Sequence, residues 1–153
     1  MTATIQFSTN TATLAIFDPE ALAHRINDDI DWWSDPYEEL DEVNLGNLML
    51  IGLRSDGIYT LNIERCEQSQ PSKLQALITC KSGKLFFGPG EEIPGGDFAP
   101  FKRPLTVGEL FDFPVGTYSV NLEFRENEIN VFVCEVMGDA INKFERQLFC
   151  DDI

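Results

Sequence analysis

Acidic and aromatic side chains are concentrated in residues 28–42, which read DDIDWWSDPYEELDE. Eight of these fifteen residues are Asp or Glu, none is Lys or Arg, and two adjacent tryptophans and a tyrosine lie among the acids. Such a stretch fits three kinds of chemistry: a carboxylate metal site, a pair of catalytic carboxylates, or an acidic face that binds a basic protein.

The spacing of the acids excludes an EF-hand calcium site. An EF-hand loop needs oxygen ligands at its positions 1, 3 and 5, glycine at 6 and glutamate at 12. A loop that begins at Asp29 has Trp33 at position 5 and Leu40 at position 12. Zinc is also disfavoured, because the chain has one histidine and no closely spaced cysteines. A looser calcium site formed by Asp28, Asp29 and Asp31, as in C2-type β-sandwich domains, is the alternative function.

Candidate catalytic residues are sparse. The single histidine, His24, lies beside Arg25 on a predicted amphipathic helix, where a surface or half-buried histidine is the ordinary explanation. The sequence contains no P-loop, dinucleotide-binding or GxSxG motif. Paired carboxylates hydrolyse glycosidic bonds in some enzymes, but a run of acids is more often a solvated face. We therefore expect a protein that is not an enzyme and that needs no cofactor.

Binding of a basic protein is the function that the acidic stretch predicts. Tryptophan and tyrosine are frequent anchors of interfaces, and surrounding charge accelerates association with a partner of opposite charge. Because adjacent residues of a helix or strand point in different directions, one tryptophan should pack in the core and the other should be exposed. The predicted partner-binding residues are Asp28, Asp29, Asp31, Trp32, Trp33, Tyr37, Glu39, Asp41 and Glu42.

The net charge of −15 is unevenly distributed along the chain. Residues 18–42 carry ten acids and one base, Arg25, and therefore −9, which leaves −6 for the other 128 residues. Such a surface should repel nucleic acids and anionic membranes and attract basic proteins at low salt. The alternative is that the acids only keep the protein soluble.

Both the N-terminus and the cysteines indicate the cytoplasm. The N-terminal residues lack a basic segment, and their apolar residues are interrupted by polar ones, so they do not resemble a secretory signal. No apolar run approaches the roughly 20 residues that span a bilayer. Cys66, Cys80, Cys134 and Cys150 lie far apart in the sequence and are expected to be free thiols in a reducing compartment.

Two short helices should hold the acidic stretch. Asp18-Pro19 and Asp35-Pro36 each combine a capping side chain with proline at the first helical position. The first helix should cover PEALAHRI, and the second should cover residues 36–43. A further helix is predicted for the C-terminal sequence GDAINKFERQLF, whose apolar residues have helical spacing. The alternative is a strand, because Phe144, Arg146 and Leu148 also fit the alternation of a strand.

The rest of the chain has the pattern of β-strands. NLMLIGL is a continuous apolar run typical of a strand that is buried on both faces, and IYTLNIERC and TYSVNLEFR alternate apolar and polar residues. Hairpin turns are predicted at Ser82-Gly83 and at Glu126-Asn127.

Residues 88–104 contain four glycines and four prolines and should form an irregular loop, whereas Thr106–Glu109 should form one helical turn. The loop is a second candidate surface, by which the protein would act as a structural subunit docked on another protein. Residues 1–153 are thus predicted to form one acidic, mainly β domain. We expect an antiparallel β-sandwich, C2-like or jelly-roll-like, with short N-terminal helices and a C-terminal helix.

The sequences TATLAIFD and DDIDWWSDPYEELDEVNLGN resemble a family of small bacterial proteins described only as a domain of unknown function. The resemblance covers residues 11–47 and implies a bacterial, cytoplasmic protein, but it carries over no catalytic or binding residue. As a class, small acidic β-rich proteins without catalytic motifs are similar to the immunity proteins that neutralise bacterial toxins. That likeness implies an inhibitor that masks a basic partner such as a toxin.

Overall fold

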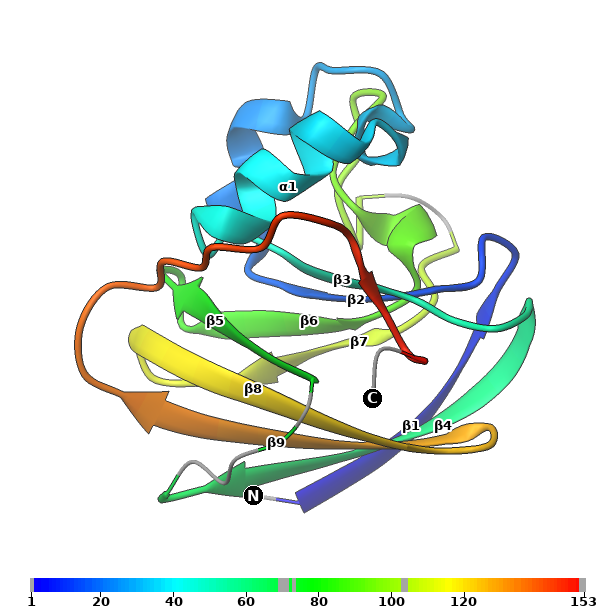
Figure 1. Cartoon of the computed structure of the whole chain (residues 1–153). Helices are drawn as coiled ribbons and strands as arrows, with labels where there is room; N and C mark the ends of the chain where they lie inside the picture. Colours follow the sequence, from blue (N-terminus) through cyan, green and yellow to red (C-terminus); the bar gives the residue numbers. More distant parts are fainter. Residues whose placement is uncertain (1, 69–71, 73, 103–104, 152–153) are drawn as a thin grey trace.

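The computed structural model describes residues 2–68, 72, 74–102 and 105–151, which form a sandwich of two five-stranded sheets covered by short helices (Figure 1). The first sheet contains, in spatial order, β1 (Thr2–Thr9), β4 (Gly57–Cys66), β9 (Glu128–Val136), β8 (Gly116–Arg125) and β5 (Leu74–Cys80). The second sheet contains β10 (Leu148–Phe149), β3 (Met49–Gly52), β2 (Thr13–Phe17), β6 (Lys84–Gly88) and β7 (Glu109–Asp112). The helices are η1 (Pro19–Arg25), η2 (Trp32–Ser34), α1 (Pro36–Asn44) and η3 (Gly90–Glu92), where η denotes a 3₁₀ helix.

The mainly β sandwich is confirmed, and both of its sheets are mixed rather than purely antiparallel. β4 and β9 are parallel neighbours in the first sheet, and β10 and β3 are parallel neighbours in the second. The other neighbouring strands of the described chain pair antiparallel, as predicted.

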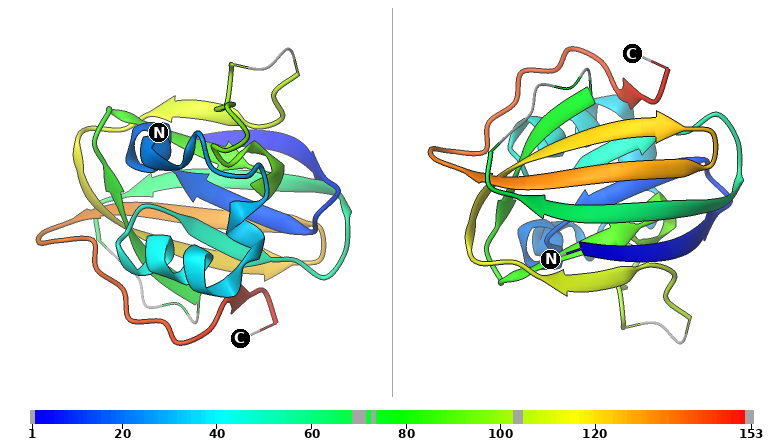
Figure 2. Two further views of the ribbon diagram at one scale, coloured as in Figure 1. Left: turned by 90° about the horizontal axis from the view of Figure 1, so that it is seen from above. Right: turned by 90° about the horizontal axis from the view of Figure 1, so that it is seen from below.

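The second sheet is buried on both faces, which explains the apolar run NLMLIGL. Successive side chains of a strand point to opposite faces. Met49 and Ile51 pack between the two sheets, whereas Leu48 and Leu50 pack against the helices together with Trp32. Figure 2 shows the helices lying across the second sheet, on the side away from the first sheet. The acidic helices are therefore fixed to the sandwich by an apolar core of their own.

One predicted hairpin turn is confirmed and the other is wrong. β8 and β9 pair around the turn at Glu126, as predicted. The turn at Ser82 and Gly83 instead carries the chain from β5 in the first sheet to β6 in the second. The buried carboxylate of Asp18 accepts hydrogen bonds from the backbone N–H groups of Lys81 and Ser82, at 2.6 and 2.7 Å, and these bonds hold the crossing.

The predicted C-terminal helix is wrong, because residues 139–147 form an irregular strap that leads to β10 beside the end of α1 (Figure 1). The side chain of Asn142 accepts a hydrogen bond from the N–H of Leu77 and donates one to its C=O, both at 2.9 Å. Asn44 of α1 bonds the N–H and the C=O of Phe144 in the same way, at 2.8 and 3.1 Å. Asn44 thus binds backbone groups of Phe144 that a helix would need for itself, and Asn142 fastens the strap to β5.

The helical turn predicted at Thr106–Glu109 is also wrong, since Glu109 already begins β7. The Thr106 hydroxyl accepts a hydrogen bond from the N–H of Phe101 at 2.9 Å, and Gly108 has a φ of 103°, which is outside the helical region. The loop is irregular as predicted, apart from the short helix η3. Its residues 103 and 104 lie outside the described residues.

Two cysteines form a disulfide, so the prediction of four free thiols is wrong. Cys66 at the end of β4 lies opposite Cys134 of β9, and their Cα atoms are 4.9 Å apart. Cys80 and Cys150 are free and buried. The two bonded cysteines are 68 residues apart, and only the parallel pairing of β4 with β9 brings them together.

Candidate functional site

Both predicted starts of the N-terminal helices are confirmed. They place the acidic stretch in the layer formed by η1, η2 and α1 on the second sheet, which we call the helical layer. Asp18 caps η1 by accepting a hydrogen bond from the N–H of Glu20 at 2.9 Å. Asp35 caps α1 by accepting hydrogen bonds from the N–H groups of Tyr37 and Glu38, at 2.9 and 3.4 Å. A proline follows each capping residue at the start of its helix. These two aspartates therefore have a structural role, as the sequence indicated.

Arg25, the one base within residues 18–42, is the centre of an ion-pair cluster inside the helical layer. Its Nε donates to Glu42 at 2.9 Å, and its Nη1 donates to Asp28 and Glu38 at 3.1 and 3.2 Å. The guanidinium also lies 4.4 Å from the ring centroid of Trp32, in a cation–π contact. Three acids of the stretch are thus paired within the protein.

Glu42 is 2% exposed, so its carboxylate needs partners inside the protein. It accepts hydrogen bonds from Nδ2 of Asn47 at 3.0 Å and from Nε of Arg25 at 2.9 Å, and it lies 2.6 Å from Nε2 of His24. Burial acts to raise the pKa of Glu42, but these three bonds outweigh it and keep the pKa below its ordinary value. His24 therefore serves as a structural partner of a buried acid.

Replacing Arg25 with methionine is expected to lower the free energy of unfolding by about 2 kcal/mol. Methionine keeps much of the aliphatic packing, and a hydrogen bond to a charged group contributes roughly 1.5–3 kcal/mol. Urea unfolding at pH 7 measures the loss. Arg65→Met is the matched control and should change stability little, because Arg65 meets Glu135 at the surface at 3.7 Å. Equal losses in the two variants would contradict the role of Arg25.

The two adjacent tryptophans differ in burial, as their alternating directions predict. Trp32 is 4% exposed, and its Nε1 donates a hydrogen bond to the C=O of Pro94 at 2.7 Å. Trp33 is partly exposed and packs against the edge of the same apolar core. One tryptophan is therefore a core residue that also ties the helical layer to the Gly/Pro-rich loop.

That loop packs directly against the acidic stretch. The N–H of Gly96 donates to the C=O of Asp28, and the N–H of Asp97 donates to the C=O of Ile26, both at 2.7 Å. Gly96 has a φ of 57°, and a Cβ there would lie 2.9 Å from the Cβ of Ile30. Glycine is needed at this position both for its backbone conformation and for the close approach.

The predicted partner-binding residues divide by burial. Asp29, Asp31, Tyr37 and Asp41 are exposed, and Asp28 and Trp33 are partly exposed. Trp32, Glu39 and Glu42 are buried. Trp32 is the tryptophan that packs in the core, and Glu39 and Glu42 lie inside the helical layer; partner binding by the nine residues stays a prediction.

One side of α1 presents three residues at intervals of one helical turn, namely Tyr37, Asp41 and Leu45. Tyr37 is 81% exposed and Leu45 is 63% exposed. The preceding loop adds the exposed carboxylates of Asp29 and Asp31. We call these five residues the acidic face. Leu45 is not among the predicted partner-binding residues, although its helical spacing from Tyr37 and Asp41 indicates the shared side.

A pocket of about 270 Å³ lies between the helical layer, the second sheet and the C-terminal strap. Glu39, which lines it, is 1% exposed. Burial raises the pKa of Glu39 to about 7, and a hydrogen bond with Gln147 acts in the opposite direction. The lining residues of this Glu39 pocket are Thr13, Trp33, Ser34, Glu39, Leu50, Gly52, Gln147, Leu148 and Phe149.

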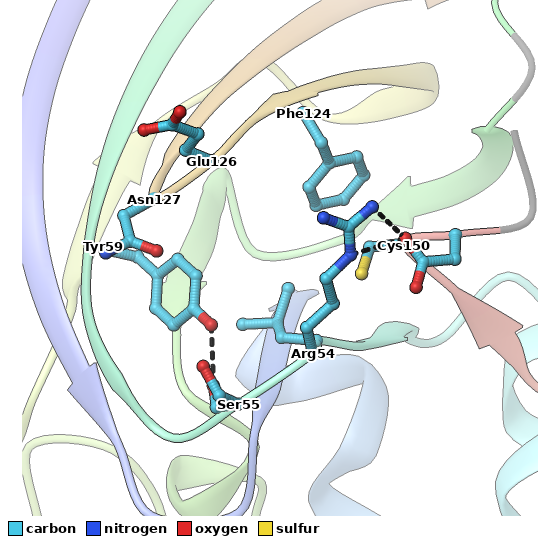
Figure 3. Close-up of a pocket in the computed structure, with 9 residues that line it drawn as sticks. Arg54, Ser55, Tyr59, Phe124, Glu126, Asn127 and Cys150 are labelled. Carbon is cyan, nitrogen blue, oxygen red and sulfur yellow. Dashed lines mark hydrogen bonds and ion pairs between the residues drawn. The ribbon is translucent and has the colours of Figure 1, made fainter.

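A larger hollow of about 490 Å³ lies where the β3–β4 and β8–β9 turns meet the C-terminal residues (Figure 3). Arg54 points across it toward Cys150, and its Nε donates to Asp151 at 2.6 Å. The hydroxyl of Tyr59 donates to the C=O of Ser55 at 2.6 Å. The polar groups of Arg54 and Tyr59 are therefore occupied by partners within the protein.

In the part of the chain that the structure describes, no three His, Cys, Asp or Glu side chains converge in an arrangement that could hold a metal ion. Asp28, one of the three aspartates of the calcium alternative, is instead paired with Arg25. Among the same residues, no helix has the length and apolar character needed to cross a bilayer.

Residues 1–148 match the family of unknown function DUF6386, and the chain belongs to that family. The resemblance noted for residues 11–47 is thus confirmed and extends over most of the chain. No functionally curated protein matches the sequence.

Two solved structures match the chain over most of its length. One is described as "Crocagin biosynthetic gene J", with a TM-score of 0.56 and 12% identity, and the match covers 90% of this chain and 98% of that one. The other is ComJ from Bacillus subtilis, described as an inhibitor of the DNA-degrading activity of NucA. It has a TM-score of 0.46 and 9% identity, over 88% of this chain and 96% of that one. The first match shows a shared fold.

Proposed function

We propose that this member of DUF6386 is a non-enzymatic binding protein that masks a basic partner protein, as immunity proteins and other protein inhibitors do. The observation that supports this most is the acidic face, where exposed carboxylates accompany an exposed tyrosine on a rigid helical layer. The two capping aspartates and the ion pair of Arg25 with the buried Glu42 hold this layer in place.

The negative charge of the acidic face is not compensated from within the acidic stretch. The one base within residues 18–42, Arg25, is committed to Glu42, Asp28 and Glu38. The carboxylates of Asp29, Asp31 and Asp41 remain exposed to solvent. A positively charged surface is attracted to such a region over about 8 Å at physiological ionic strength.

Tyr37 is suited to anchor a partner at the centre of this field. A tyrosine that is 81% exposed leaves a large apolar ring in water, and covering the ring on binding is favourable. Leu45 extends the apolar contact along the same side of α1. In such a surface the apolar side chains supply affinity, and the surrounding charges increase the rate of association with a partner of opposite charge.

The partner that this surface favours is a basic protein, of which a bacterial toxin is one class. Nucleic acids and anionic membranes carry the same sign of charge as the acidic face and should not bind it. A bacterial origin and a cytoplasmic location stay predictions. The Cys66–Cys134 bond is of a kind that persists mainly in oxidising compartments, so its state in cells tests the location.

Neutralising the acidic face with Asp29→Asn, Asp31→Asn and Asp41→Asn is expected to weaken partner binding about tenfold, mainly through slower association. The partner is first captured from a lysate of the native organism at low salt and is released at high salt. The purified partner is then used in surface plasmon resonance at several salt concentrations. The difference between the variant and the wild type should shrink as salt rises.

The control changes the net charge equally at the other sheet. It carries Glu64→Gln and Glu123→Gln, exposed residues of β4 and β8, and Asp56→Asn in the turn before β4. This variant should bind within about twofold of the wild type, because its charges lie outside the helical layer. Equal weakening in both variants, or in neither, would contradict a role of the acidic face.

A further inference from the structure

Two buried polar atoms belong to residues that line the Glu39 pocket, and neither atom has a hydrogen-bond partner among the described residues. They are Nε1 of Trp33, which is a donor, and Oε2 of Glu39. A buried polar atom without a partner costs free energy, so such atoms are uncommon in folded proteins. Two residues that line the pocket therefore carry an unused donor and an unused carboxylate oxygen, both covered in the unbound protein.

The side chains that line this pocket include an acid and no base. Glu39 is the one ionisable side chain among its lining residues, and Leu50, Leu148 and Phe149 supply apolar walls. The nearest charged residues along the strap, Glu145 and Arg146, are exposed and line a neighbouring hollow. The raised pKa of Glu39 is the expected consequence of a buried acid without a cation beside it.

A positively charged group on an aliphatic stem matches a pocket that has one carboxylate and apolar walls. The cation satisfies and neutralises the carboxylate, and the stem covers the apolar walls. One free oxygen suits the compact ammonium of lysine better than the two-pronged guanidinium of arginine, which prefers both oxygens of a carboxylate. The volume of about 270 Å³ is just below the range of about 300–1,000 Å³ for small-molecule sites, so it suits a single side chain.

We propose that the Glu39 pocket receives one lysine side chain of the basic partner, with the ammonium on Glu39 and a backbone carbonyl of the partner accepting a hydrogen bond from Trp33. This proposal rests on the proposed function and names the anchor point of that partner. Two of the lining residues, Trp33 and Ser34, follow Asp31 of the acidic face by two and three positions in the chain. Gln147, the present hydrogen-bond partner of Glu39, is an exposed neutral residue, and Oε2 of Glu39 is the oxygen that the ammonium binds.

The probe is N-acetyl-lysine N-methylamide, and the reporter is the indole N–H signal of Trp33 in NMR spectra. Because the chain has two tryptophans, Trp33→Phe assigns the signal. At pH 8 the probe should shift this signal saturably. N-acetyl-norleucine N-methylamide, which has a similar aliphatic chain without the ammonium, should bind at least about tenfold more weakly, since it has no charge to pair with Glu39.

Two further comparisons isolate the role of Glu39. Affinity for the lysine probe should fall at least about tenfold between pH 8 and pH 5.5, because Glu39 binds a proton as the pH falls below about 7. Glu39→Gln should abolish binding at both pH values, whereas Asp29→Asn should not. Equal binding of the norleucine probe, or no binding of the lysine probe to the wild type, would overturn the proposal.

The pocket and the proposed function fail in different ways. If Glu39→Gln binds the purified partner as tightly as the wild type while the acidic-face variant does not, the function stands and the lysine anchor is refuted. If the lysine probe occupies the pocket but no basic protein binds the chain, the site stands and the proposed function is refuted. Circular dichroism of Glu39→Gln establishes in either case that the variant is folded.

Discussion

Reduction of the Cys66–Cys134 disulfide is expected to lower the free energy of unfolding by about 4 kcal/mol. The bond links positions 68 residues apart, and the chain-entropy relation gives about 4 kcal/mol for a closed loop of that length. The bond also fastens β4 to β9, the parallel pair at the centre of the first sheet. Urea unfolding with and without a thiol reductant measures the difference.

A double variant, Cys66→Ser and Cys134→Ser, is the control, because the reductant should leave its stability unchanged. Thiol titration of the wild type, unfolded without reductant, should detect two thiols, those of Cys80 and Cys150. Detection of four thiols would show that the bond does not form and would restore the expectation drawn from the sequence.

Glu39→Gln is expected to raise the free energy of unfolding by about 3 kcal/mol at pH 8 and to leave it nearly unchanged at pH 4. The pKa of Glu39 is raised from 4.5 to about 7 on folding, so the folded protein binds more protons than the unfolded chain between these two pH values. The stability from protonated Glu39 is thus fully present below about pH 4.5 and is lost as the pH rises to about 7. One pKa unit corresponds to about 1.4 kcal/mol.

Urea unfolding at pH 4, 5, 6, 7 and 8 tests this expectation. The wild type should lose stability relative to Glu39→Gln as the pH rises through this range, and the comparison cancels contributions from other titrating groups. Glu20→Gln is the matched control, because Glu20 is an exposed acid of η1, and its pH dependence should match that of the wild type. If Glu39→Gln matches the wild type at every pH, Glu39 is not held in an environment that disfavours its charge.

Local features of the fold could be read from the sequence. Asp18 and Asp35 cap their helices as predicted, because a cap depends on a side chain and on backbone N–H groups two or three residues away. The strand β3 is buried on both faces as its apolar run indicates. The turn at Glu126 joins β8 and β9, since residues close in the chain pair without a competing partner.

Pairing between distant segments could not be read in the same way. A short turn at Ser82 and Gly83 is compatible with a hairpin and equally with a crossing between sheets, and the carboxylate of Asp18 decides for the crossing. The C-terminal segment has helical spacing, but Asn44 of α1 binds its backbone, and its own Asn142 binds the backbone of β5. Both outcomes depend on residues more than 60 positions away in the chain.

The acidic stretch shows this division most clearly. Residue types and local spacing were enough to predict that residues 18–42 carry a charge of −9, that two helices begin within them, and that the two tryptophans point in different directions. Which of these acids face water depends on tertiary packing. Glu42 is buried because Arg25, His24 and Asn47 bind its carboxylate, and Glu39 is buried in a pocket that the C-terminal strap helps to line. The physical reason is that charge is a property of each residue, whereas burial depends on which distant segments pack over it.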